Sequence, residues 1–434
     1  MKTLTLILLL CLALTVMAHD YVPAPPQDHP ILLKGGTVFT ITDGTLEDTD
    51  VLFDNGRIAA IGRDLTPPDG CEIIDVAGKH VYPTMVATGT SLGLTEIGAV
   101  RATNDAREVG RINPDVQTRM AYNPDSEIIP TTRSNGVGYA QIMPGGSLLQ
   151  GRSCLVNLDA WTQEDAVEVS EVALHLAWPA VTISTGWWEE RSAEEQKKDM
   201  IKNREAIGRT FDDAHAYYLA RKANPNIEID SRWEAMVPVF DRELPVWVHA
   251  NDYRQIEQAI AFSRRYGFRM VLLGGCDAAL AIDLLKENSI PVVYGYSTAL
   301  PNRSDNDYDQ AFIVPRLLYD AGIPFCIGKF SATAVRNIAF DAGMAEGFGL
   351  DHDIALRSVT LSAAEIMGAE SEIGSLEVGK KASIVVSDGD LLDFLTHHVT
   401  MMFIEGRKVD LDDKHKELYR KYRDRKGPGA GSGN

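Results

Sequence analysis

The sequence predicts an α/β protein in which parallel strands alternate with helices, joined to a smaller β-rich module. Short β-prone runs separated by turns occupy residues 31–83, and the same pattern returns after residue 380. Between them, continuous apolar runs alternate with amphipathic helical runs, most clearly from residue 246 onward. Apolar strands spaced by helices are typical of parallel pairing, either in a doubly wound sheet or in a (β/α)₈ barrel.

The overall composition is that of a globular protein, and its charge restricts the kinds of molecule that the protein can bind. Of the 434 residues, 45% are hydrophobic, and 42 Lys and Arg stand against 61 Asp and Glu, a formal net charge of −19. Such an acidic surface repels phosphate backbones, so we expect no nucleic-acid partner. The five cysteines include no C-x-x-C pair, which disfavours a structural zinc site. Apolar flanks at Cys154 and Cys326 favour buried free thiols over disulfides.

Residues 1–18 have the pattern of a signal peptide. Lys2 precedes an almost wholly apolar run over residues 4–17, and small residues at 16–18 suit cleavage. The apolar run is shorter than the ~20 residues of a membrane span. We therefore expect an exported protein, periplasmic or secreted, without stable membrane insertion. Residues 19–30 are rich in proline and predict an extended linker.

In residues 31–83 the pattern indicates short strands and no helix. Asn55-Gly56, between two apolar runs, is the signal of a type I′ hairpin turn. Near the other end of the chain, further strands are predicted at 382–387, 400–404 and 407–411. Because two β-rich segments flank a long middle, we assign 31–83 and 370–412 to one small β-sandwich closed by both chain ends.

Residues 84–369 form the α/β part. Strands and helices are predicted in the order 246–248 and 253–266, 269–273 and 277–287, 291–294 and 308–321, then a strand at 324–327. The first half is less regular, with a Gly-, Asn- and Pro-rich stretch over 99–151 and a charged helix over 192–222 that reads as an insertion. The pattern of residues 413–434 predicts a basic helix followed by a disordered tail. That helix either binds an acidic partner or is simply solvated.

Five short motifs follow one another along nearly the whole mature chain. They are LKGGTV at 33–38, GRIAAIG at 56–62, DVAGKHVYP at 75–83, PVWVHA at 245–250 and GSLEVGKKA at 374–382. Together they resemble the amidohydrolase superfamily, in its imidazolonepropionase-like branch. The resemblance implies a (β/α)₈ TIM barrel of the metal-dependent hydrolase type over residues 84–369, plus the β-sandwich as a composite domain. It also implies a hydrolase of C–N bonds, other than ordinary peptide bonds, in a cyclic amide or peptide-like substrate.

The sequence departs from this family at the metal site. The resemblance implies ligands from a His-x-His after strand 1, a Lys or Glu on strand 4, a His on each of strands 5 and 6, and an Asp on strand 8. Here the replacements are Gly89 and Ser91 for the His pair, Gly274 for the strand-6 His and Phe330, give or take one residue, for the Asp. The strand-4 residue is not located. Only His249, on strand 5, remains as a metal ligand. Because a catalytic zinc needs about three protein ligands, we predict a degenerate site with at most one divalent metal, such as zinc, and no other cofactor.

Six residues are predicted to bind substrate: His249, Arg101, Asn123, Arg133, His175 and Lys329. His249 stands at a carboxyl-terminal strand end, where barrel residues face the active site. It either contacts a ligand or is a structural remnant hydrogen-bonded in the barrel mouth. His175 is either a second site residue or a core histidine. Arg101, Asn123 and Arg133 fall among loops expected at the mouth, which either bind an anion or serve as turns.

Two functions from different classes remain open at this stage. The first is an exported hydrolase of C–N bonds with an altered site based on His249; its catalytic residues are not identified. The second is a non-catalytic amidohydrolase fold, either a ligand-binding protein or an inactive subunit partnered with an active homologue. Both imply a small-molecule or peptide-like ligand, and both leave room for a homo-oligomer or a complex with an active amidohydrolase homologue.

Overall fold

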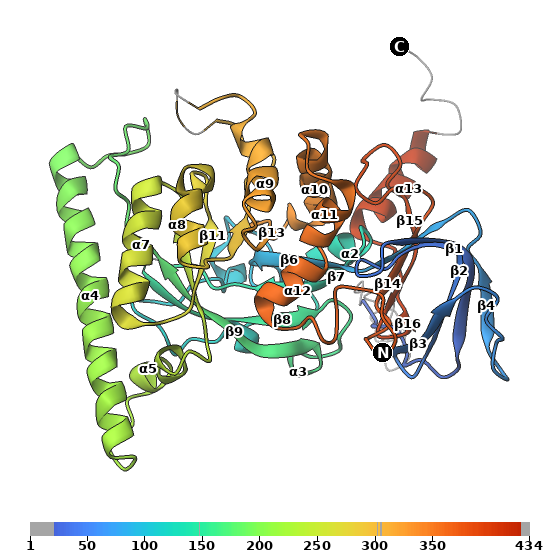
Figure 1. Cartoon of the computed structure of the whole chain (residues 1–434), viewed down its shortest axis with the longest axis horizontal. Coiled ribbons are helices and arrows are strands. Elements are labelled where there is room, and N and C mark those ends of the chain that lie inside the picture. The colour runs from blue at the N-terminus through green and yellow to red at the C-terminus, as the bar shows by residue number, and fades with distance from the viewer. Residues whose placement is uncertain (1–20, 147, 302, 304–305, 427–434) are drawn as a thin grey trace, which may run out of the picture.

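The structure is a computed structural model that describes residues 21–146, 148–301, 303 and 306–426 (Figure 1). The predicted signal peptide, the first two linker residues 19–20 and the predicted tail after Lys426 lie outside these residues. Within the described part of the chain, no helix is both long enough and apolar enough to cross a membrane.

Strands from both ends of the chain form one eight-stranded sheet. Its order is β16-β15-β14-β5-β1-β2-β3, with β4 pairing off this path against β1. The strands are β1 (Ile31–Phe39), β2 (Thr45–Asp54), β3 (Arg57–Gly62), β4 (Glu72–Asp75), β5 (His80–Pro83), β14 (Ile384–Ser387), β15 (Val399–Ile404) and β16 (Arg407–Lys408). The antiparallel pairing of β14 with β5 joins the two chain ends. At the predicted hairpin turn, Asn55 and Gly56 have φ of 49° and 76°, as a type I′ turn requires.

This composite domain has its own apolar core. Buried side chains such as Val51, Phe53 and Ile58 from the first strands pack in one cluster with Ile384 and Phe403 from the last. The rings of Phe53 and Phe403 meet edge to face, with centroids 5.0 Å apart. Burial of one shared core therefore holds together segments separated by more than three hundred residues.

A second eight-stranded sheet is the barrel, in the order β13-β12-β11-β10-β9-β8-β7-β6. Its strands are β6 (Met85–Thr90), β7 (Val137–Ile142), β8 (Leu149–Asn157), β9 (Val167–Ala177), β10 (Val246–Ala250), β11 (Met270–Gly274), β12 (Val292–Tyr294) and β13 (Phe325–Ile327). The predicted TIM barrel is confirmed. Across the seam, the N–H of Lys329, just after β13, donates to the carbonyl of Thr88 on β6 (3.2 Å).

One barrel strand, β8, runs antiparallel to both neighbours. The links on either side of it are short: residues 143–148 precede it, and residues 158–166, which include the four-residue helix α3 (Gln163–Ala166), follow it. Parallel pairing would need crossovers of a dozen or more residues, so these links permit only a meander. As a result, the carboxyl-terminal end of β8 lies at the amino-terminal end of the other barrel strands.

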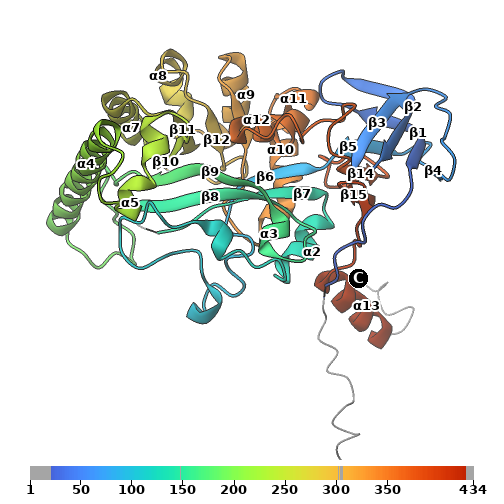
Figure 2. The same ribbon diagram turned by 90° about the horizontal axis from the view of Figure 1, so that it is seen from below.

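The helices lie around the barrel, except for the last one, α13, which projects from the molecule beside the composite domain (Figures 1 and 2). They are α2 (Ile128–Arg133), α4 (Ala193–Ala223), α5 (Ser231–Glu234), α6 (Val237–Phe240), α7 (Tyr253–Tyr266), α8 (Ile282–Glu287), α9 (Gln310–Asp320), α10 (Ile338–Gly347), α11 (His352–Ser358), α12 (Leu361–Met367) and α13 (Lys414–Lys426). Two predicted helices agree closely with α7 and α4. Each begins with a capping box, from Asp252 and Ser192 respectively, which satisfies the first free N–H groups. The predicted helix over 277–287 is split into a 3₁₀ turn (Ala278–Ala281) and α8.

The barrel interior is filled with side chains from alternate strand positions. Val86, Tyr139, Leu155, Trp247 and Val293 belong to one buried cluster with Ala363, Ala364 and Met367 of α12. Helix α12 therefore contributes to the core at the amino-terminal end of the barrel. Cys154 and Cys326 are buried and unpaired, in agreement with the predicted free thiols.

Candidate ligand site at the mouth of the barrel

Two histidines meet inside the barrel near the carboxyl-terminal ends of its strands. His175 lies on β9 and His249 on β10, strands that pair in parallel with His175 opposite Trp247 and His249 opposite Ala177. The Nδ1 atom of His175 lies 2.9 Å from Nε2 of His249, and the two rings meet edge to face. His175 is fully buried, whereas His249 retains some exposure. Because β9 immediately precedes β10 in the sheet, His175 occupies the strand-4 side of the site that the sequence left unassigned.

Both rings are held in the neutral state. Burial, together with the neighbouring His249, lowers the pKa of His175 well below its usual value. Burial also lowers the pKa of His249 to about 4. At pH 7 one neutral imidazole therefore donates an N–H to the lone pair of the other. Within the described residues, Nε2 of His175 has no hydrogen-bond partner, which leaves one polar ring atom directed into the barrel.

The ring of Phe330 lies close against three glycines at the mouth of the barrel. A Cβ atom on Gly89 would lie 2.7 Å from Cδ1 of Phe330, and one on Gly295 would lie 2.3 Å from Cε2. A Cβ on Gly328 would come within 3.2 Å of the same ring. Real Cβ contacts are longer than the first two distances, so glycine is required beneath the ring. Leu273 also packs against it.

The residues present do not fit a catalytic metal centre of the usual kind. Among the described residues, no group of three or more His, Cys, Asp or Glu side chains could hold a metal ion. The two histidines supply only two nitrogen ligands, and a catalytic zinc needs about three protein ligands. At Gly274, a Cβ would lie 2.5 Å from Oδ1 of Asn251, so a larger side chain does not fit without a shift of Asn251. No step of chemistry is therefore assigned to a metal.

Lys329 reaches a buried carboxylate at the same end of the barrel. Its Nζ donates to Oδ1 of Asp341 (2.9 Å) and to Oγ1 of Thr298 (3.0 Å). Thr298 in turn donates to the same carboxylate oxygen at 2.6 Å. Only 3% of the Asp341 side chain is exposed, against 21% for Lys329. The ammonium group is thus fixed between the two oxygens with its outer side toward solvent.

A cavity of about 170 Å³ lies beside this mouth, lined by Cys276, Tyr294, Tyr296, Leu300 and neighbouring residues. Cys276 follows β11, Tyr294 is the last residue of β12, and Tyr296 and Leu300 follow β12. Burial raises the pKa of Cys276 to about 11 and that of Tyr296 to about 12. The thiol and the phenol therefore stay protonated at neutral pH and offer neutral polar contacts.

The other predicted residues lie apart from the histidine pair. Arg101 is exposed and donates to the carbonyl of Asn104 (2.8 Å); it lines a separate cavity of about 180 Å³. The side-chain oxygen of Asn123 accepts from the N–H of Asp125 (3.1 Å), which is the local bond of an Asx turn. The structure thus brings His175 and His249 together, with Lys329 at the same end of the barrel, and leaves these two residues in surface loops.

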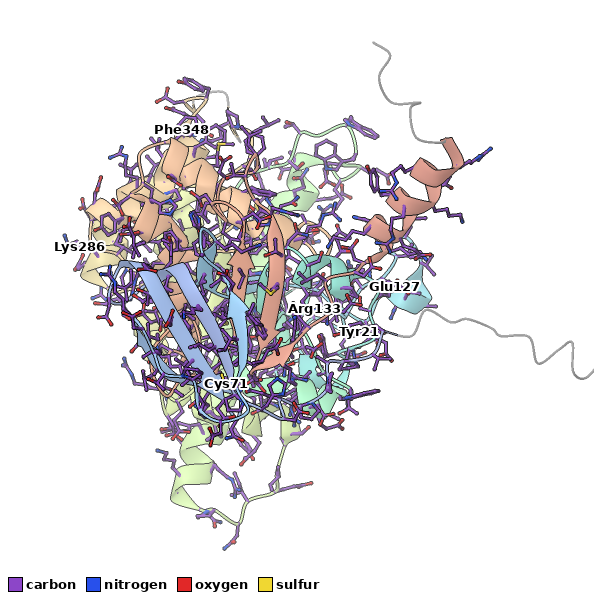
Figure 3. All side chains as sticks on the ribbon, turned by 90° about the vertical axis from the view of Figure 1, so that its right-hand side faces the viewer. Tyr21, Cys71, Glu127, Arg133, Lys286 and Phe348 are labelled. Carbon is purple, nitrogen blue, oxygen red and sulfur yellow. The ribbon has the colours of Figure 1, made fainter. Side chains whose placement is uncertain are left out.

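Arg133 lies at the opposite end of the barrel. Its guanidinium is fully buried and donates to Asp159 at 2.9 Å, an ion pair in which neither side chain is exposed. Figure 3 shows Arg133 beside Tyr21, whose ring lies 4.1 Å from the guanidinium carbon. Asp159 follows β8, and the reversed direction of that strand carries it to the amino-terminal end.

Sequence reasoning missed the partners of its own candidates. It placed Phe330 at a lost ligand position but gave it no role, and it did not identify Asp341 as the partner of Lys329. A signal was available: glycines end or follow four barrel strands, namely Gly89, Gly274, Gly295 and Gly328. Repeated glycine at strand ends indicates close approach of another group.

Comparison with known proteins finds relatives among the amidohydrolases. Residues 254–410 match the amidohydrolase family. A segment of 69 residues, 16% of this chain, is 39% identical to human dihydropyrimidinase-related protein 5 but spans only 12% of that protein's length. The imidazolonepropionase of Syntrophobacter fumaroxidans is 24% identical over 416 residues, covering 80% of this chain and 93% of that protein.

A solved structure shows the same fold over nearly the whole chain. An amidohydrolase from Thermotoga maritima superposes with a TM-score of 0.76 at 24% identity, covering 88% of this chain and 99% of its own. The matched segment, the long imidazolonepropionase alignment and this shared fold agree with the motif order in the sequence. Over residues 254–410 the chain matches the amidohydrolase family, and along most of its length its sequence is similar to imidazolonepropionase.

Proposed function

We propose that this superfamily member binds a small cyclic-amide or peptide-like ligand at the barrel mouth and does not hydrolyse it through a metal centre. The observation that carries the proposal is the ring of Phe330, which lies so close that a Cβ atom on Gly89 would be 2.7 Å from it and one on Gly295 would be 2.3 Å from it. An apolar ring in this place excludes the ion and the water that the metal-dependent reaction needs.

The polar groups that remain suit recognition of a neutral amide. His249 is neutral and partly exposed, so it can donate to a carbonyl oxygen or accept from an amide N–H. Lys329 adds a positive charge whose inner side is already held by Asp341. A few convergent polar groups in an otherwise apolar concavity are typical of ligand sites.

Metal analysis of the purified protein tests the proposal directly. After incubation with zinc, manganese, iron or nickel salts and removal of free ions, we expect less than about a tenth of an equivalent bound. We also expect hydantoin, dihydrouracil or an N-acyl dipeptide to raise the melting temperature, and His249→Ala to abolish that rise. Stoichiometric metal that is lost in His249→Ala would overturn the proposal.

A second candidate is hydrolysis of C–N bonds at an altered site. It is favoured by His249, which keeps the family's strand-5 position, and by an alignment with imidazolonepropionase that spans 80% of this chain. In this alternative His249 acts on the substrate as a neutral base without help from the other family ligands. Turnover of the same cyclic amides or dipeptides that is lost in His249→Ala would establish this candidate. Binding without turnover, with or without added metal, would favour the first.

A further inference from the structure

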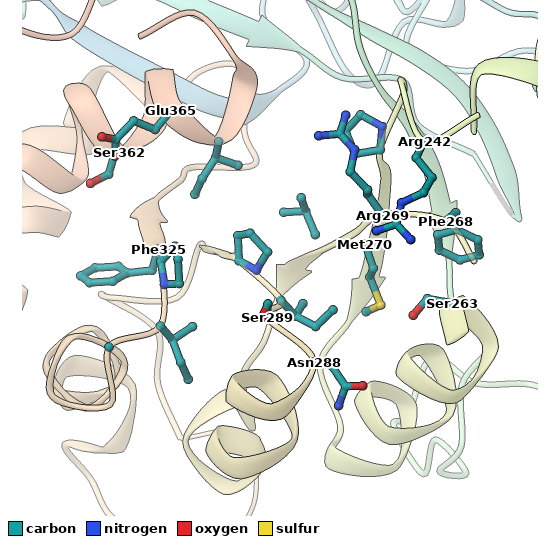
Figure 4. Close-up of a pocket in the computed structure, with 18 of the residues that line it drawn as sticks. Arg242, Ser263, Phe268, Arg269, Met270, Asn288, Ser289, Phe325, Ser362 and Glu365 are labelled. Atoms are coloured by element: carbon teal, nitrogen blue, oxygen red, sulfur yellow. The ribbon is translucent and has the colours of Figure 1, made fainter. Parts of the chain in front are cut away.

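A cavity of about 900 Å³ lies at the amino-terminal end of the barrel, opposite the mouth (Figure 4). Its lining includes the residues that directly precede four parallel strands: Pro245 before β10, Arg269 before β11, Pro291 before β12 and Pro324 before β13. The remaining walls come from the ends of α7, α8 and α9 and from α11 and α12. The described residues of the mouth do not contribute to it.

The charge of this cavity is opposite to that of the protein. Four arginines line it, Arg242, Arg264, Arg269 and Arg357, against one acidic side chain, Glu365. The chain as a whole has 61 acidic and 42 basic residues. An excess of guanidinium groups in a concavity of an acidic protein concentrates anions from solution.

Three of these arginines are not neutralised by a carboxylate. Within the described residues, Arg242 and Arg264 form no ion pair, and Arg269 donates to the backbone carbonyl of Glu243 (2.6 Å). Only Arg357 is paired, at 2.5 Å from Glu365. Figure 4 shows Arg242 and Arg269 side by side, across the cavity from Ser362 and Glu365. Two adjacent guanidinium groups with free N–H donors match the oxygens of one carboxylate or phosphate.

The floor of the cavity is apolar. Phe268, Met270 and Phe325 are buried side chains that line it, and Val271 joins it to the barrel core. A bare inorganic ion would leave this floor in contact with water. A ligand that combines an anionic head with an apolar or aromatic body would cover both parts.

We propose that this cavity is a second ligand site, which takes an organic anion whose carboxylate or phosphate lies against Arg242 and Arg269 and whose apolar body covers Phe268 and Phe325. The site is independent of the mouth, because it is built from the opposite strand ends. Fatty acids and nucleoside monophosphates share the required chemistry, and binding measurements separate them.

Isothermal titration calorimetry on the full chain tests the site with dodecanoate, adenosine 5′-monophosphate, adenosine and inorganic phosphate. We expect dodecanoate or adenosine 5′-monophosphate to bind with a Kd below ~1 mM, more tightly than adenosine or phosphate. Whichever of the two binds more tightly identifies the source of the ligand. The affinity should fall as salt is added, since the exposed arginines are screened.

The variant Arg242→Gln/Arg269→Gln should weaken binding by about tenfold for each arginine removed. Arg209→Gln, an exposed arginine on α4 outside the cavity, is the matched control and should leave Kd unchanged. If the double variant fails to fold by circular dichroism, Arg264→Gln replaces it. Absence of binding by both organic anions, equal affinity for phosphate, or unchanged affinity in the arginine variants would overturn the proposal.

Discussion

A Cβ atom on Gly89 would lie 2.7 Å from Cδ1 of Phe330, so the glycine and the aromatic ring are fitted to each other. In the interpretation of the sequence, Gly89 replaces the first histidine of the His-x-His and Phe330, give or take one residue, replaces the aspartate. The ring also needs Gly295 beneath it. A larger side chain at Gly89 or Gly295 therefore requires that the ring of Phe330 move or be removed.

The first prediction concerns this contact. Gly89→Ala should lower the free energy of unfolding by ~2–4 kcal/mol, because alanine is strained at φ of +74° and also collides with Phe330. In the Phe330→Ala background the collision is gone, so the same substitution should cost at least ~1 kcal/mol less. Urea unfolding of the four proteins of this cycle measures the difference.

Gly44→Ala is the matched control for that cycle. Gly44 has φ of +75° but no atom within 4 Å of the added Cβ, so alanine there meets only the backbone strain of ~1 kcal/mol. Equal costs at Gly44 and Gly89, or strict additivity between Gly89→Ala and Phe330→Ala, would show that the ring does not constrain Gly89.

The histidine pair should make stability depend on pH. The pKa of His249 falls to about 4 on folding, and that of His175 falls well below its usual value. Below pH 6.5 the unfolded chain therefore binds protons that the folded chain does not, and stability falls as the pH is lowered. Each histidine contributes up to ~1.4 kcal/mol per pH unit in this window.

Unfolding free energies measured between pH 7 and pH 4 check this sign. His249→Gln should flatten the slope, because one of the two groups that resist protonation is removed. A slope in wild type that is flat or reversed over this range would contradict the assignment of two neutral rings.

The third prediction concerns Lys329 and the buried carboxylate of Asp341. Lys329→Met should cost about 3 kcal/mol, because it leaves Asp341 buried without its countercharge. Asp341→Asn in the same background should recover part of this loss, since the uncompensated charge is then absent. The exposed pair of Arg316 and Asp320 is the control, and Arg316→Met should cost less than ~0.5 kcal/mol. If Lys329→Met and Arg316→Met lowered the free energy of unfolding by similar amounts, the role of burial would be refuted.

The fourth prediction separates stability from binding at Arg133. Removing one partner of its fully buried pair with Asp159 should cost ~3–5 kcal/mol, so Arg133→Met should lower the melting temperature markedly. Ligand affinity at the mouth, measured by calorimetry at a temperature where the variant is folded, should not change. A selective loss of affinity with stability preserved would instead support the substrate-binding role predicted from the sequence.

Local patterns in the sequence were sufficient for much of the fold. The helix α7 spans the predicted residues 253–266, and the Asn55-Gly56 turn forms the expected hairpin. Strand-helix alternation and the resemblance indicated the barrel. The two β-rich segments indicated a sandwich built from both chain ends, where the structure has one eight-stranded sheet. The antiparallel β8 was not predicted, because a buried apolar run has the same appearance in either strand direction.

The sequence alone indicated which metal ligands the site lacks. Only the tertiary structure showed which side chains contact one another there. Gly89, Gly274 and Phe330 could be read from the sequence as lost ligands, because alignment to a motif needs only local order. That Phe330 covers Gly295, that His175 bonds His249, and that Arg133 meets Asp159 all depend on strand register and direction. Such contacts join residues far apart in the chain, and only the packed barrel brings them within a few ångströms of each other.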